Sequence, residues 1–260
     1  MPTIVALVKH VPDTWSTKTL EDDHTLDRTS VDNVIDEVNE YSVEQALRLR
    51  DDNPDAGFKV VALTMGPAQA DEALRKALAM GADDAVLVSD DSLAGADALS
   101  TAWTLNAALN KLDDVQLITA GTEASDASTG LLTGLLAEYR QLPALTALHK
   151  VELADGTVQG IRDDARGTWE FEAPLPAIVS VTDKSDKPRF PNFKGLMAAK
   201  KAEITTFSLA ELGIEAIAPT TAVTAAEKRP PRTAGEVISE PNPQDAAKKI
   251  ADFLSAKNLI

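Results

Sequence analysis

The stretch FKVVALTMGPAQADEALRKALAMGADDAVLV, residues 58–88, reads in turn as a strand, a helix and a second strand. The apolar run from Phe58 to Thr64 is typical of a buried strand, and the run from Ala85 to Val88 repeats it. Between them, Gly66-Pro67 opens a helix and Gly81 closes it. The helix has one apolar face, made by Ala70, Ala73, Leu74, Ala77 and Leu78. This order predicts two parallel strands joined by a crossover helix.

The same alternation continues on both sides of this unit. Upstream, Ile4 to Val8 predicts a buried strand, and a helix is expected over residues 40–50 with Asn39 as its N-cap. Downstream, Val115 to Ile118 predicts a fourth strand, and residues 129–139 predict a helix. A further helix is predicted by the apolar spacing of Ala98, Ala102, Leu105, Leu109 and Leu112. The pattern predicts an α/β protein with a doubly wound, mostly parallel, Rossmann-like sheet.

After Pro143 the pattern changes to shorter strands joined by turns. Asp155-Gly156 is a hairpin signal, and we expect this block to extend the sheet. From Gly213 to Pro243 the chain is rich in Pro, Thr and Ala and predicts an extended arm. A last helix is predicted over residues 245–257, with Ala246, Ile250 and Phe253 at helical spacing. The expected organisation is a nucleotide-binding domain over residues 1–235, followed by an arm and helix over 236–260 that pack on another chain.

Composition excludes several classes of function. The 260 residues contain no cysteine, which excludes disulfides, thiolate metal sites and cysteine-ligated iron–sulfur clusters. A net charge of −16 argues against non-specific nucleic-acid binding. The start lacks a signal-peptide pattern and no apolar run approaches the roughly 20 residues of a membrane helix, so we expect a cytoplasmic protein without membrane insertion.

No residues show the pattern of a catalytic or metal site. The three histidines, His10, His24 and His149, are scattered without metal-ligand spacing. The sequence also lacks a G-x-G-x-x-G loop after the first strand, a G-x-x-x-x-G-K-[ST] loop and a G-x-S-x-G elbow. We therefore expect a protein that is not an enzyme and that has no metal.

The remaining candidate is a set of loops at the carboxyl ends of the parallel strands, where open α/β sheets bind ligands. The loop from Gly121 to Gly130 is rich in small and hydroxyl residues, which suit a phosphate near a helix start. Leu7 to Lys9 and Met65-Gly66 are expected at the same edge. The alternative is an ordinary loop with Ser128 or Thr129 as a helix N-cap.

The segment from Lys187 to Lys201 reverses the charge of the chain, because it carries lysines and an arginine but no acid. Its prolines disfavour helix, and Phe190 and Phe193 lie among the cations. Large apolar side chains in such a loop indicate a docking surface. The alternative is a surface loop whose two rings fold back onto the domain.

Over its whole length the chain resembles the β (small) subunit of electron transfer flavoprotein, a family that includes FixA. The resemblance rests on the order and spacing of several motifs, none of them decisive alone. They are Lys9-His10-Val11-Pro12-Asp13, residues 63–69, residues 77–83, the Gly121 loop, Arg162-Asp163-Asp164 with Gly167 and Glu170, residues 175–180, Pro188-Arg189-Phe190 and Arg232-Thr233-Ala234-Gly235.

The resemblance implies a heterodimer with an α subunit that makes most contacts to an FAD. That flavin takes electrons from acyl-CoA and related dehydrogenases and passes them to a quinone-linked oxidoreductase. The resemblance also implies an adenine-nucleotide pocket in this chain, which holds AMP in most members and a second FAD in bifurcating members; we expect AMP. The alternatives are an adenine-nucleotide enzyme of the ATP pyrophosphatase-ligase kind, which needs a glycine loop absent after the first strand, and a nucleotide sensor.

Family positions can be carried over to this sequence by number. The implied AMP pocket consists of Leu7, Asp36, Asn39, Met65, Gly121, Thr122, Glu123, Asp126, Ala127, Ser128 and Thr129. In the family an aromatic residue lies near the α-subunit flavin, and the matching position here is Thr14, so that Trp15 would have to supply the ring. Arg162 and Asp163 match a family Arg–acid pair near the subunit interface. The alternative for this pair is a solvated turn. An anchoring leucine for partner dehydrogenases matches Phe193, with Phe190, Leu196 and Met197 beside it.

Overall fold

The computed structural model describes residues 1–233, 235 and 237–260 and divides the chain into two units, Met1–Thr224 and Ala225–Ile260. Ala234, in the motif that ends at Gly235, lies outside the described residues. So does Glu236, the first residue of the expected arm.

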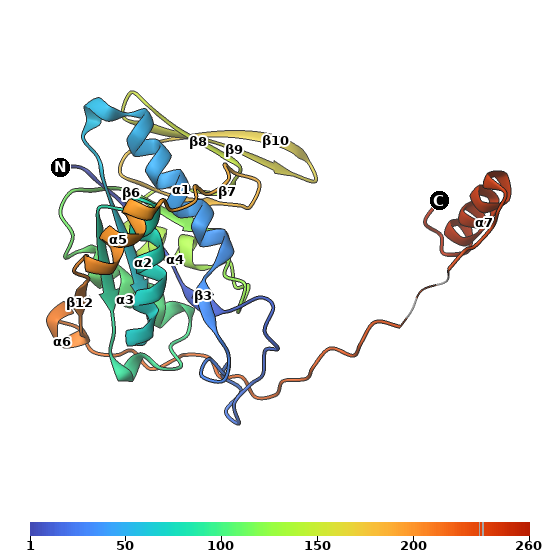
Figure 1. The fold of residues 1–260 in the computed structure, drawn as a ribbon, viewed down its shortest axis with the longest axis horizontal. Coiled ribbons are helices and arrows are strands. Elements are labelled where there is room, and N and C mark those ends of the chain that lie inside the picture. Colours follow the sequence, from blue (N-terminus) through green and yellow to red (C-terminus); the bar gives the residue numbers. More distant parts are fainter. Residues whose placement is uncertain (234, 236) are drawn as a thin grey trace. The chain divides into compact units, whose positions relative to one another are not determined.

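The first unit is built on a seven-stranded parallel sheet of order β12-β5-β4-β1-β6-β11-β7 (Figure 1). Its strands are β1 (Thr3–Leu7), β4 (Lys59–Met65), β5 (Asp84–Val88), β6 (Val115–Gly121), β7 (Ala144–Leu148), β11 (Ala177–Val181) and β12 (Thr205–Phe207). Every residue of β1 and of β11 is buried, which explains why these strands are continuous apolar runs.

Helices cover both faces of this sheet, as predicted. Alternate residues of β1 enter two different cores: Ile4 and Ala6 pack with α1 (Glu37–Asp52) and α2 (Asp71–Met80), whereas Val5 and Leu7 pack with α3 (Ala98–Leu109) and α4 (Leu132–Arg140). The apolar face predicted for α2 is buried throughout. The remaining helices of this unit are α5 (Phe193–Lys201), α6 (Leu209–Leu212) and the short 3-10 turns η1 (Pro54–Ala56), η2 (Ala68–Ala70) and η3 (Asp91–Leu93).

The predicted starts of two helices are wrong. Helix α1 begins at Glu37, and its N-cap is Asp36 rather than Asn39, because the Asp36 carboxylate accepts a 3.1 Å bond from the Val38 amide. Helix α4 begins at Leu132 instead of residue 129. Ser128 at φ 47° and Gly130 at φ 60° hold the preceding backbone in the left-handed region, which a helix cannot continue through.

The block after Pro143 extends the parallel sheet only through β7 and β11. Between them, β8 (Lys150–Ala154), β9 (Thr157–Asp164) and β10 (Gly167–Pro174) form a separate antiparallel sheet. The predicted hairpin is confirmed, because Asp155 and Gly156 join β8 to β9 with φ values of 50° and 79°. A third sheet pairs β2 (His10–Pro12) with β3 (Asn33–Ile35) and closes the base of the loop between them.

The second unit contains α7 (Pro243–Ala256), with Asn242 as its N-cap. Proline at the first helical position and an Asn cap explain why the helix begins there. Ile250 and Phe253, from the predicted apolar stripe, are both exposed. Among the residues the structure describes, no helix is long and apolar enough to cross a membrane.

Candidate functional site

The candidate site lies at the carboxyl ends of β1 and β6, where the strand order reverses. After β1 the chain builds β4 and β5 on one side, and it then returns to add β6 and β11 on the other. Ligands of open α/β sheets bind at such a switch point. The loop 122–131 leaves this edge after β6, and Lys9 follows β1.

Side chains at the start of α1 join these two strand ends. The backbone amide of Lys9 donates to Asn39 Oδ1 at 2.7 Å, and the Asp36 amide donates to the Lys9 carbonyl at 2.9 Å. The Ser125 amide donates to Asp36 Oδ2 at 2.7 Å. Both Asp36 and Asn39 are buried. These hydrogen bonds therefore join the start of α1 to the segments that follow β1 and β6.

Gly121 allows the loop after β6 to pass close to this wall. A Cβ at Gly121 would come within 2.6 Å of Asn39 Nδ2 and 3.0 Å of a Val38 methyl group. The amide and hydroxyl of Thr122 both donate to the Val181 carbonyl, at 2.9 and 3.0 Å. Glycine is required here for close approach.

Asp126 is the centre of a charge cluster that the sequence reasoning missed. Its buried carboxylate accepts from Lys9 Nζ at 2.9 Å and from Arg28 Nη2, and both cations are partly exposed. Burial raises the pKa of the Asp126 carboxyl, but the charge of Lys9 and hydrogen bonds from Lys9 and Arg28 outweigh this, so its pKa lies below the usual 3.8. No local pattern points to Arg28, because it is 98 residues from Asp126.

The rest of the loop is exposed. Glu123, Ala127, Ser128 and Thr129 face solvent, and the Ser128 amide closes a turn on the Ala124 carbonyl at 2.8 Å. The alternative that made Ser128 or Thr129 an N-cap is wrong, because the N-cap of α4 is Leu131. Within the described residues no side chain caps the start of α4.

Leu7 and Met65 lie at the same edge on neighbouring strands. Leu7 pairs with Leu63 of β4, and Met65 follows two residues later at the strand end. Leu7 is buried and its carbonyl accepts from the Ser42 hydroxyl at 3.4 Å. The structure thus brings Leu7, Asp36, Asn39, Gly121 and Asp126 together at the carboxyl ends of β1 and β6, with Met65 at the end of the neighbouring strand β4.

Two pairs of predicted site residues lie elsewhere in the fold. Thr14 and Trp15 form a turn in which the Trp15 amide donates to Asp13 Oδ1 at 2.9 Å and the indole is almost fully exposed. None of the hydrogen bonds among described residues links this turn to the Gly121 loop.

Arg162 and Asp163 lie in β9 rather than in a turn, and the Asp163 side chain is half exposed. The Arg162 guanidinium carbon is 4.8 Å from the centre of the Phe171 ring. Asp163 accepts from the Thr168 hydroxyl at 2.6 Å, and its carboxylate is 3.5 Å from His149 Nδ1. The two side chains are therefore placed by the β9–β10 pairing.

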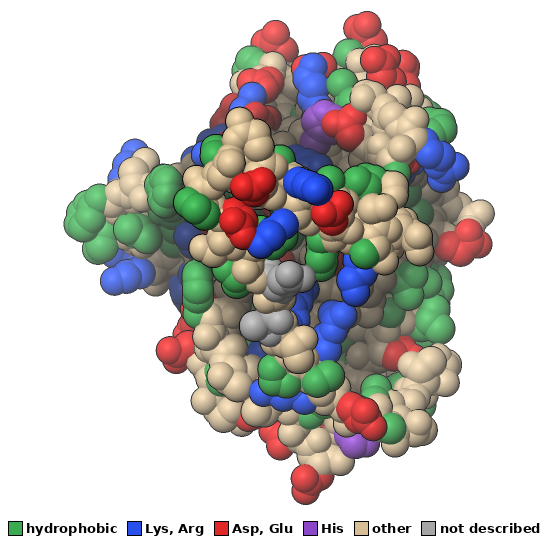
Figure 2. Space-filling view, turned by 90° about the vertical axis from the view of Figure 1, so that its right-hand side faces the viewer, with side chains coloured by type: hydrophobic (Ala, Val, Ile, Leu, Met, Phe, Trp, Pro, Cys, Tyr) green, Lys and Arg blue, Asp and Glu red, His purple; other side chains and the backbone are tan. Residues whose placement is uncertain are grey.

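The docking segment, residues 187–197, presents its rings to solvent. Phe190 is 94% exposed and Phe193 is 79% exposed, while Leu196 and Met197 are partly exposed in α5. The alternative that folds the rings onto the domain is therefore wrong. Figure 2 shows that hydrophobic side chains flanked by basic ones also gather at the left-hand edge of that view. Arg189, one of the cations of this segment, is bonded to Glu44 and Asp51, which lie outside the segment.

Within the described residues there is no group of three potential metal ligands. The arrangement offers shape, amide donors and two cations at the crevice, and exposed apolar groups at the docking segment.

Comparison with known proteins agrees with this arrangement. Residues 23–212 match the electron transfer flavoprotein domain family. Electron transfer flavoprotein subunit beta of Mycobacterium tuberculosis is 44% identical over 100% of both chains. The caffeyl-CoA reductase-Etf complex subunit CarD of Acetobacterium woodii is 31% identical over 99% of both, and protein FixA of Sinorhizobium fredii is 32% identical over 82% of this chain and 76% of its own. The chain therefore belongs to the electron transfer flavoprotein β-subunit family, whose members are electron carriers rather than enzymes.

Proposed function

We propose that this chain is the β subunit of a cytoplasmic heterodimeric carrier. An α subunit holds most of an FAD, which takes electrons from acyl-CoA and related dehydrogenases and passes them to a quinone-linked oxidoreductase. The flavin supplies all of the redox chemistry. This chain contributes a structural nucleotide site, a docking segment and contacts to the α subunit.

We propose that the crevice between β1, α1 and the β6 loop binds AMP. The observation that carries this proposal is the pair of partly exposed cations, Lys9 and Arg28, that Asp126 holds in the loop between β6 and α4. The start of α4, which ends this loop, has no side-chain cap. A phosphate dianion suits open helix amides and two partly exposed cations. Asp126 would hold those cations in place and leave the cluster with net positive charge for the phosphate.

The adenosine part would lie along the wall of the same crevice. Asp36 and Asn39 use their oxygens within the protein, so their proposed role is to shape this wall, and Leu7 would offer backbone to the adenine. Met65 would close the edge. The ribose would be wrapped by the loop residues Gly121, Thr122, Glu123, Ala127, Ser128 and Thr129.

A second candidate ligand for the crevice is FAD, as in the bifurcating members that the resemblance brings in. The relative named as a subunit of a caffeyl-CoA reductase-Etf complex aligns over 99% of both chains, so the fold is shared by subunits of differently named complexes. The open loop at residues 123–130 favours neither ligand by size alone.

The remaining predicted residues are proposed to face protein partners. Trp15, beside Thr14, and the Arg162–Asp163 pair are assigned to the α-subunit side near its flavin. Exposure of the Trp15 indole and ordered placement of Arg162 on β9 support contact with another chain. Phe193, with Phe190, Leu196 and Met197, is assigned to transient docking of dehydrogenases.

Co-expression with an α subunit tests the proposal. A yellow heterodimer should form, and denaturation should release one FAD and one AMP per heterodimer, identified by mass. Two FAD per heterodimer would instead support the second candidate. A colourless protein that purifies alone would contradict the assignment as a carrier subunit.

A further inference from the structure

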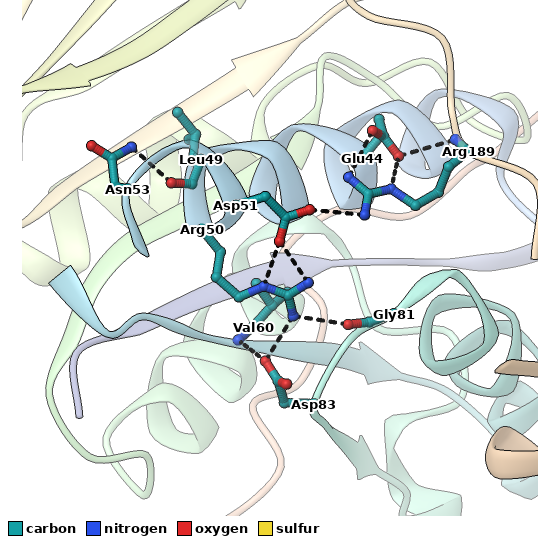
Figure 3. A network of polar contacts seen from close by, with 9 residues as sticks. All are labelled: Glu44, Leu49, Arg50, Asp51, Asn53, Val60, Gly81, Asp83 and Arg189. Atoms are coloured by element: carbon teal, nitrogen blue, oxygen red, sulfur yellow. Dashed lines mark hydrogen bonds and ion pairs between the residues drawn. The ribbon is translucent and has the colours of Figure 1, made fainter. Parts of the chain in front are cut away.

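Arg189 connects the docking segment to helix α1 through one carboxylate. Directly before Phe190, its Nε and Nη2 donate to Glu44 Oε2 and Oε1 at 2.8 and 3.0 Å, and its backbone amide donates to Glu44 Oε2 at 3.0 Å (Figure 3). This planar two-point contact is available to arginine but not to lysine. The backbone and side chain of one residue are therefore held by the same group.

Glu44 lies in the core side of α1, with its side chain only 7% exposed. Within the described residues, every hydrogen bond to its carboxylate comes from Arg189. A buried carboxylate without a partner is strongly destabilising. Because Glu44 cannot leave its helix, Arg189 and the backbone beside Phe190 are held against α1.

A second carboxylate extends this contact into the body of the domain. Arg189 Nη1 donates to Asp51 Oδ2 at 2.9 Å, and Asp51 also accepts from Arg50 at 2.9 and 3.0 Å. Arg50 in turn donates to the Gly81 carbonyl at 3.0 Å and to Asp83 at 3.1 Å. Asp83 accepts the Val60 amide at 2.8 Å, as Figure 3 shows. This series of contacts ends at the start of β4 and at the end of α2.

The other side of the docking segment is fixed by close packing. A Cβ at Gly195 would lie 2.5 Å from the Ala79 carbonyl of α2, and Arg75 of α2 donates to the Ala199 carbonyl at 2.8 Å. Phe190 directly follows Arg189, and Phe193 is the first residue of the packed helix α5. Their rings are exposed, yet the backbone that carries them is held at both ends.

We propose that Arg189 and Glu44 form a positioning pair that presents Phe190 and Phe193 to the apolar pocket of a partner dehydrogenase. This inference rests on the docking role proposed above. An exposed ring on a pre-ordered backbone loses less conformational freedom when it binds. Loss of Arg189 or of Glu44 would therefore weaken binding even though neither residue touches the dehydrogenase.

The neighbouring pair of Arg48 and Asp186 provides a matched control. Their side chains meet at 3.0 Å, in the same region of α1 and the same loop, but both are exposed. Exposed pairs of this kind contribute little to stability. Asp186→Asn removes a loop-to-α1 contact without stranding a buried charge.

The test measures electron transfer from an acyl-CoA dehydrogenase to the yellow heterodimer over a range of carrier concentrations, together with a thermal melt and flavin content. Arg189→Lys should raise KM for the carrier by about threefold to tenfold, with kcat within about twofold. Flavin content should be unchanged, and Asp186→Asn should behave as the unmodified protein.

A combined variant separates positioning from general stability. In a background that carries both Phe190→Ala and Phe193→Ala, Arg189→Lys should add little to KM, because the groups that it positions are gone. An unchanged KM for Arg189→Lys would overturn the inference. So would a combined variant whose increase in KM is the product of the increases caused by the separate substitutions. If Phe193→Ala alone leaves KM unchanged, the docking role itself is wrong and the inference fails with it.

A milder variant covers the case in which Arg189→Lys prevents folding. Asp51→Asn leaves the Glu44 contact intact and removes only the outer link. It should raise KM by a smaller factor than Phe193→Ala, with an unchanged melting temperature. Suppose that Arg189→Lys does not fold and that Asp51→Asn has a normal KM. The Arg189–Glu44 pair would then serve the stability of the fold alone.

Discussion

At the scale of the residue, single charged side chains join parts of the chain that are far apart in sequence. Asp126 holds Lys9 and Arg28, and Glu44 holds Arg189 across 145 positions. In each case a buried carboxylate meets partly exposed cations, so the acid is the fixed end of the pair and the cation is the end nearer to solvent. Such pairs are best understood as positioning devices.

The Asp126 cluster predicts a specific pH dependence. The pKa of Asp126 is lower in the folded protein than its usual 3.8, so its contribution to stability is present above that pH and is lost as pH falls below it. Asp126→Asn should lower the free energy of unfolding by about 1–3 kcal/mol near neutral pH. Urea denaturation of both proteins down to about pH 3 should show the difference shrinking. A constant difference across this range would contradict the assignment.

Two glycines allow a matched test of the crevice wall. Gly121→Ala forces a methyl group to within 2.6 Å of Asn39 Nδ2, so the wall must shift and nucleotide retention should fall severalfold. Gly235 of the second unit has no atom within 4 Å of an added Cβ, and alanine there should leave the nucleotide in place. The measurement is nucleotide released per protein after denaturation. Equal retention in both variants would show that the wall tolerates the change.

At the scale of the element, α5 carries the docking side chains and is placed by α2. Its N-cap, Asn192, accepts the Gly195 amide at 2.8 Å, so the helix begins at Phe193 directly after the proline-rich loop. Lys200 and Lys201 in its last turn suit the negative end of the helix dipole. The segment predicted as a loop is therefore half helix.

Phe193→Ala tests this element. Loss of an apolar anchor should weaken dehydrogenase binding by about 2 kcal/mol, roughly thirtyfold in affinity. Because the ring is exposed, folding stability should change by less than about 0.5 kcal/mol. Steady-state transfer at several carrier concentrations and a thermal melt measure both effects. Leu99→Ala, an exposed apolar change on α3, is the control, and a similar loss of affinity in that variant would remove the special role of Phe193.

At the scale of the whole molecule, the two units have different requirements for a partner. The first contains two buried cores, one on each face of its sheet. The second contains one amphipathic helix, α7, with no buried residue. A single helix of 14 residues is marginal alone, so α7 needs another surface to bury Ile250 and Phe253.

Deletion of residues 236–260 tests whether that surface belongs to the α subunit. The truncated chain should fold, because both cores lie within residues 1–224, but it should assemble poorly with the α subunit and retain less FAD. Size-exclusion chromatography and flavin absorbance measure these effects. An Asn258→Ala substitution, beyond the end of α7, serves as the control. An intact yellow heterodimer after the deletion would refute the assignment.

The sequence alone predicted the strands β1, β4, β5 and β6 of the parallel sheet and the helices that follow them, because buried strands are apolar runs and crossover helices carry an apolar face. It did not predict β7 or β12. It also determined the Asp155-Gly156 hairpin, since two consecutive positive φ angles favour these residues locally. Tertiary structure alone decided that Arg189 is bound to Glu44, that Asp126 is occupied by Lys9 and Arg28, and that β8 to β10 leave the main sheet. Those outcomes depend on which buried carboxylate meets which cation and on which strand edges of the main sheet remain unpaired. Such pairings form only once segments that are distant in sequence have been brought together.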